Sequence, residues 1–125
     1  MKPIIKTIEE LYGRREATGE VILDEMAECL RKTRIIAVAD LAALMDVDAH
    51  QLNMAVRLLT GMTTRDVINR WRLLQAQDLL RQGTTGDARD DRIRVLNAVA
   101  RRCGWRSYRV LLKVAHRYGV KLEIL

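Results

Sequence analysis

The side chains best suited to chemistry form a basic run near the C-terminus. Arginine, lysine and histidine recur there at helical spacing. They lie on the outer face of a helix expected over residues 107–118 and just before it: Arg106, Arg109, Lys113, His116 and Arg117. Side chains of this type bind phosphates, because each phosphate they neutralise releases condensed counterions. A face that only keeps a helix in water has the same composition. The position of the run in the fold must therefore decide between a polyanion partner and a solvated surface.

The net charge is divided unevenly between the two halves of the chain. Residues 1–62 contain 8 basic and 10 acidic side chains, whereas residues 63–125 contain 14 basic and 6 acidic ones, giving net charges of −2 and +8. A positive field of this size attracts polyanions such as DNA. The sequence therefore favours a nucleic-acid partner for the C-terminal half.

Motifs for catalysis are missing from the sequence. It contains no glycine-rich phosphate loop, no His-Glu metal motif and no pair of carboxylates in an apolar setting. Its two histidines, His50 and His116, each fall on a predicted outer helix face. Cys29 and Cys103 lie far apart without neighbouring metal ligands, which favours reduced thiols over a disulfide or a zinc site. We expect no enzyme activity, no cofactor and no metal.

The hydropathy pattern favours a cytoplasmic protein with no membrane partner. No apolar run approaches the roughly 20 residues that a membrane span needs, and residues 1–6 lack the layout of a signal peptide. Apolar residues make up 49% of the chain and charged residues 30%. That balance is typical of a chain that packs a core.

Apolar residues recur with a helical period almost throughout, so the predicted fold is all-α. The first stripe, which we expect to be buried against its own lobe or a second copy, is Ile4, Ile8, Leu11 and Tyr12. A second helix is predicted from about Glu20 to Lys32. A short helix over 39–45 and a tight turn precede another helix over 48–60, with Asp48 as its N-cap and Gly61 as its stop.

One long helix is predicted over residues 64–82, between Gly61 and Gly83. At 1.5 Å per residue it would be roughly 30 Å long, close to the pitch of B-DNA at about 34 Å. Trp71 and Trp105 are predicted to pack in the core. The expected organisation is an N-terminal helical extension (1–19), a first unit (20–62), a connecting helix (63–82), a loop (83–91) and a second unit (92–125).

Two stretches of the sequence resemble the DNA-binding domain of AraC/XylS-type bacterial transcription regulators. One has a Gly, an Ile-Asn-Arg, an Arg-Leu, an Ala and a Leu-Leu at that family's spacings, from Gly61 through Ile68-Asn69-Arg70 and Arg72-Leu73 to Leu79-Leu80. The other contains Leu96, Val99-Ala100 and Cys103-Gly104-Trp105. The resemblance covers roughly residues 20–120. It implies two helix-turn-helix units joined by a long helix, each placing its second helix in a major groove of double-stranded DNA.

The resemblance also implies roles for individual residues. Carried over position by position, it assigns contacts with base edges to His50, Asn53 and Met54 in the first unit and to Tyr108, Arg109 and Lys113 in the second. Contacts with phosphate are expected from Arg57, Arg106, His116 and Arg117. Arginine and lysine suit guanine, and asparagine suits adenine, because their donors and acceptors match the groove edge.

The chain departs from the family pattern at three places. Met54 stands where the family has a basic residue, and Leu58 and Leu59 stand where it has polar ones. Either Met54 contacts a thymine methyl group, or the first unit no longer reads DNA and its surface binds a protein. The loop 83–91 is longer than the family's, by about nine residues. The tail 120–125 lacks the family's closing Ser-Pro and aromatic residue.

Residues 1–19 lie outside the resemblance, and a helix there could hold a protein partner or a second copy of the chain. Regulators of this family commonly carry a ligand-sensing domain of over a hundred residues. We expect no small-molecule effector domain in 125 residues. The rival to DNA reading is a protein-interaction module that keeps the fold.

Overall fold

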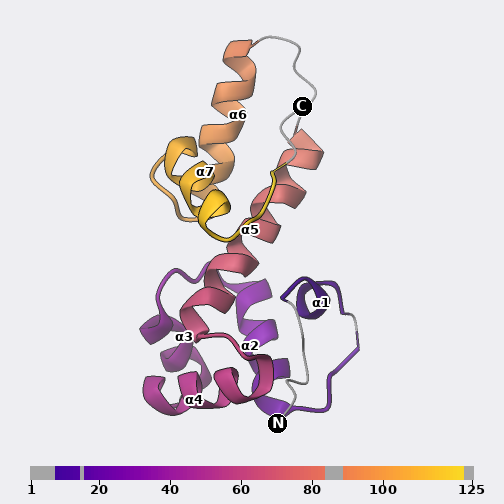
Figure 1. Cartoon of the computed structure of the whole chain (residues 1–125), viewed down its shortest axis with the longest axis vertical. Coiled ribbons are helices and arrows are strands. Elements are labelled where there is room, and N and C mark those ends of the chain that lie inside the picture. Colours follow the sequence, from indigo (N-terminus) through magenta and orange to yellow (C-terminus); the bar gives the residue numbers. More distant parts are fainter. Residues whose placement is uncertain (1–7, 15, 84–88, 123–125) are drawn as a thin grey trace. The chain divides into compact units, whose positions relative to one another are not determined.

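The computed structural model describes residues 8–14, 16–83 and 89–122, and this part of the chain is all-helical. Its seven helices are α1 (Ile8–Gly13), α2 (Val21–Lys32), α3 (Val38–Met45), α4 (Ala49–Thr60), α5 (Thr64–Gly83), α6 (Arg89–Arg102) and α7 (Tyr108–Arg117) (Figure 1). No strand occurs in these ranges. The all-α prediction is confirmed, and none of the described helices combines the length and apolar composition needed to cross a membrane.

Helix boundaries follow the signals in the sequence closely. The long helix predicted over residues 64–82 is α5, which ends one residue later at Gly83. Asp48 is the N-cap of α4, where its carboxylate accepts a hydrogen bond from the Gln51 amide at 3.1 Å. Gly61 ends α4 in the left-handed conformation with φ 75°. At the predicted loop 83–91, helix α6 already begins at Arg89, while 84–88 lie outside the described residues.

Contacts divide the chain into two compact units, residues 1–71 and 72–125. In the first unit, α2, α3 and α4 pack against one another around a core that includes Leu23, Met26, Leu41 and Leu52. Trp71 closes this core and is 1% exposed. Its predicted place in the core is confirmed.

The N-terminal stripe is buried within the first unit. Ile8 and Leu11 are 0% and 1% exposed, and the ring of Tyr12 meets that of Trp71 edge-on, with centroids 4.9 Å apart. Ile4 lies outside the described residues. The burial predicted for this stripe is therefore confirmed at Ile8 and Leu11.

In the second unit, the C-terminal half of α5 packs with α6 and α7. The buried residues of this core are Leu73, Ala76, Leu80, Leu96, Val99, Ala100, Cys103, Trp105, Leu111 and Ala115. Trp105 is 7% exposed, which confirms its predicted packing role. Cys29 and Cys103 are both free cysteines.

Helices α3 and α6 end in the same way before the connections to α4 and α7. Asp46 follows α3 with φ 54°, and Gly104 follows α6 with φ 92°, so both residues are left-handed. The next amide then reaches back over five residues to a helix carbonyl, Val47 to Ala42 at 3.0 Å and Trp105 to Ala100 at 2.8 Å. This is the Schellman arrangement, which satisfies carbonyls that the helix end leaves free. Each pair thus changes direction by the same hydrogen-bonded device.

Replacing Leu11 by alanine should destabilise the chain by about 2–5 kcal/mol, because it empties a filled core position. Leu58→Ala is the matched control. It removes the same atoms from a side chain that is 55% exposed, so its effect should stay within about 0.5 kcal/mol. Urea unfolding followed by circular dichroism measures both. Equal effects of the two changes would show that α1 is not packed as described.

Candidate nucleic-acid interface

The outer face of α7 carries four exposed basic side chains. Arg109, Lys113 and Arg117 are exposed at intervals of one helical turn, and His116 is exposed beside them. The opposite face of the helix is fixed by the buried Leu111 and Ala115. Residues four apart are neighbours on a helix surface. The cations therefore form a ladder that the packing of α7 holds away from the core.

No carboxylate lies close to these cations along the sequence. From residue 92 to residue 122 the sequence contains nine arginines and lysines and no aspartate or glutamate. Arg106 adds an exposed cation in the turn before α7. A solvated helix face usually mixes both signs of charge, whereas a surface for a polyanion collects one sign.

Tyr108 lies apart from this basic ladder. It is half-buried and packs against the core of the second unit. Its backbone amide donates to the side-chain oxygen of Asn97 at 3.1 Å, which ties the start of α7 to α6. The structure thus gives Tyr108 a packing contact, and its contact with a base stays a prediction.

The outer face of α4 is exposed in the same way but has a different composition. His50, Met54, Arg57 and Leu58 are exposed, while Leu52 and Val56 hold the inner face in the core. Met54 and Leu58 are 60% and 55% exposed. Arg57 is the only charged residue in α4.

Asn53, predicted to read a base, is half-buried at the edge of the outer face of α4. Its side-chain oxygen accepts hydrogen bonds from the amide of Thr64 at 3.0 Å and from the Thr64 hydroxyl at 3.3 Å. It therefore satisfies an amide at the first turn of α5. The oxygen that would accept from adenine is already bonded within the protein.

The two outer faces occupy equivalent positions in their helices. A displacement of 59 residues carries the buried Leu52 and Val56 of α4 onto the buried Leu111 and Ala115 of α7. The same displacement pairs their exposed positions: His50 with Arg109, Met54 with Lys113, Arg57 with His116 and Leu58 with Arg117. The helices therefore present corresponding surfaces of different chemistry.

Arg72 holds the turn that precedes α7, a role that the sequence analysis missed. This side chain is only 5% exposed. Its Nε donates to the carbonyl oxygen of Cys103 at 2.8 Å, and its guanidinium group lies 4.0 Å from the centre of the Trp105 ring. The one available signal was an arginine between the apolar Trp71 and Leu73. All three of these residues are buried.

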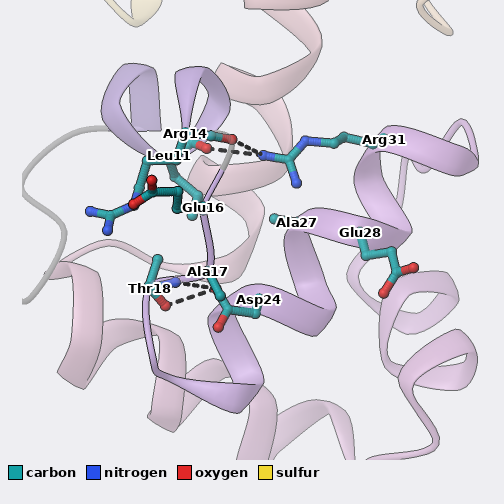
Figure 2. Close-up of a pocket in the computed structure, with 9 residues that line it drawn as sticks. All are labelled: Leu11, Arg14, Glu16, Ala17, Thr18, Asp24, Ala27, Glu28 and Arg31. Atoms are coloured by element: carbon teal, nitrogen blue, oxygen red, sulfur yellow. Dashed lines mark hydrogen bonds between the residues drawn. The ribbon is translucent and has the colours of Figure 1, made fainter.

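A pocket in the first unit lies between α1, the segment that follows it and α2 (Figure 2). Two hydrogen-bonded groups cross it. Arg31 donates to the carbonyl oxygens of Leu11 at 3.3 Å and Arg14 at 3.0 Å. Asp24 accepts from the amide and the hydroxyl of Thr18 at 2.7 and 2.9 Å. These bonds join the N-terminal segment to α2.

The electrostatics of this pocket support a structural role. The pKa of Asp24 is held below its ordinary value of 3.8, chiefly by the amide of Thr18 and also by the Thr18 hydroxyl. The pKa of Glu28 is also lowered, by its hydrogen bond with Lys32 at 2.6 Å. Among the described residues, no three His, Cys, Asp or Glu side chains gather as a metal site would require.

No family model, curated protein or solved structure matches this chain. The assignment of a function therefore rests on the chain's own residues.

Removing the guanidinium of Arg72 should loosen the second unit. Arg72→Met keeps the aliphatic stem but loses the donor to Cys103 and the contact with Trp105, at an expected cost of about 1–3 kcal/mol. Arg72→Lys should not restore the loss, because an ammonium group lacks the planar guanidinium that serves both contacts. Arg109→Met, at an exposed position of the same unit, should change the unfolding free energy by less than about 0.5 kcal/mol. Full rescue by lysine would contradict the geometry.

The lowered pKa of Asp24 predicts a pH-dependent contribution to stability. A depressed folded pKa stabilises the protein above the ordinary value of 3.8, and this contribution disappears as the pH falls through the folded value. Asp24→Asn should therefore be less stable than the wild type at pH 7, and the difference should shrink toward pH 2. Thermal unfolding between pH 2 and 7 measures it, with Asp40→Asn as the control for loss of one charge. A gap that stays constant with pH would refute the assignment.

Proposed function

We propose that this chain is a sequence-specific DNA-binding transcription regulator of the AraC/XylS type, acting in the bacterial cytoplasm. In this proposal α3 with α4 and α6 with α7 are the two helix-turn-helix units. Helices α4 and α7 read the major groove. The observation that carries the proposal is the exposed basic face of α7, in a stretch of sequence without carboxylates.

The repeated turn supports the two-unit interpretation. Both pairs use a left-handed residue followed by a hydrogen bond back to the first helix. In each pair the second helix buries one side and leaves the other in solvent. A helix that is to enter a major groove needs an uncovered face on which three or four side chains can reach base edges.

The residues of α7 divide into two proposed roles. Arg109 and Lys113, near the start and middle of the exposed face, are assigned to guanine O6 and N7, because their donors match those acceptors. Arg106, His116 and Arg117 lie at the ends of the face and are assigned to phosphates, which orient a protein on the duplex without selecting a sequence. Arg57 is the corresponding phosphate ligand on α4.

A second candidate function rests on the apolar residues exposed in the first unit. Met54 and Leu58 on α4 and Leu44 on α3 are each more than half exposed. Exposed apolar side chains that cluster can mark a protein-binding surface. In this alternative the fold is kept as a protein-interaction module, and the first unit no longer reads DNA.

Replacing Arg109 and Lys113 together by alanine tests the DNA proposal. The probe is a duplex selected from a randomised pool by the wild-type chain. The double variant should bind the selected duplex at least about tenfold more weakly than the wild type, since each base contact is worth about 1–3 kcal/mol. It should then bind unrelated duplexes almost as well as it binds the selected duplex. Fluorescence anisotropy at several salt concentrations gives both the affinity and the salt slope.

Arg94→Ala with Arg102→Ala is the matched control, because it removes two exposed cations from α6 in the same unit. It should leave the preference for the selected duplex intact. Arg117→Ala should weaken binding to all duplexes alike and lower the salt slope by about one. If the Arg109 and Lys113 variant kept wild-type affinity and salt slope, the DNA proposal would fail.

A further inference from the structure

Met54 is at the centre of the exposed face of α4. The buried residues Leu52 and Val56, 2% and 0% exposed, fix the inner side of the helix. Met54 points the opposite way by the helical period and is 60% exposed, and Leu58 follows one turn later at 55%. Neither side chain therefore contributes to the core of its own unit.

The position of Met54 corresponds to that of Lys113 on α7. The displacement of 59 residues that superimposes the buried faces of the two helices brings these two residues together. If both helices enter grooves through their outer faces, both positions face base edges. Lysine at this position can donate to the acceptors of guanine. The thioether of methionine has no donor and is only a weak acceptor, so it cannot recognise a base by a strong hydrogen bond.

One group in the major groove fits an apolar side chain. The C5 methyl of thymine is the apolar feature that distinguishes base edges there. Residues 49–60 contain no carboxylate, so nothing on α4 itself repels the phosphates on either side. The exposed His50 and Arg57 flank Met54. The face therefore combines an apolar centre with polar edges able to bind the backbone.

We propose that Met54 determines sequence specificity by contacting a thymine methyl group. The inference rests on the proposed function and deepens it. The chain then recognises a composite site in which thymine lies opposite α4 and guanine lies opposite α7. Leu58, one turn further along α4, extends the apolar contact to a neighbouring position.

Replacing thymine by deoxyuridine tests the contact, because it removes only the methyl group. In the duplex selected by the wild-type chain, each thymine is replaced in turn and the affinity is measured. Burial of one methyl predicts a loss of about fourfold at the contacted thymine. The Met54→Ala variant should bind the thymine and uridine duplexes equally, while Met54→Leu should retain part of the discrimination.

Leu44→Ala is the matched control, since Leu44 is 53% exposed but lies on α3. It should discriminate thymine from uridine as the wild type does. If each deoxyuridine substitution lowers the affinity of the wild type and of Met54→Ala by the same factor, Met54 does not contact a thymine methyl group. DNA binding by the chain would stand, and the exposed face of α4 would then fit a protein partner. If no duplex is enriched from the pool, DNA binding itself fails.

Discussion

A hydrogen bond across a left-handed residue sets the geometry on which the rest of this structure depends. In each helical pair, one residue with positive φ follows the end of the first helix. The next backbone amide then donates a hydrogen bond to a carbonyl oxygen in the last turn of that helix. Glycine adopts this conformation without strain at residue 104, and Asp46 is among the few residue types that tolerate it. Because the turn is short, the second helix must bury one side against the first. Its other side is then left exposed.

In both units, the frame formed by the two helices and the turn between them leaves the residue types on the outer face of the second helix unconstrained by core packing. Leu52 and Leu111 fill equivalent buried positions, so core packing places the same demand on both helices. No such demand acts on the exposed positions, which are apolar at Met54 and cationic at Lys113. In the second unit the frame has an added support, since the buried Arg72 fixes the turn before α7. The hydrogen bond from Arg72 fixes the position of the turn from which α7 begins. The backbone that carries the long, flexible cationic side chains of α7 is therefore held in place at its start.

The sequence predicted the helices well because their signals are local. The helical spacing of apolar residues and the flanking glycines predicted the bounds of α5 to within one residue, and Asp48 predicted the start of α4 as its N-cap. The exposed cations of α7 were also predictable from the helical period. Asn53 and Tyr108 were harder, because a residue at the border of a helix face can turn inward. The Asn53 side chain bonds the first turn of α5, and the Tyr108 side chain packs against the core of the second unit. The role of Arg72 depends on a carbonyl 31 residues away, a contact that no local pattern encodes.

Nuclear magnetic resonance tests directly whether the outer face of α7 meets DNA, as proposed. Amide signals of a labelled chain are followed while the duplex selected by the chain is added. We expect the signals of residues 104–117 to shift or broaden first, and those of α4 to change as the first unit binds. Signals of α1 and of the segment that joins it to α2 should stay in place. Shifts concentrated on α1 and α2, with α7 unaffected, would show that α7 is not the surface that binds DNA.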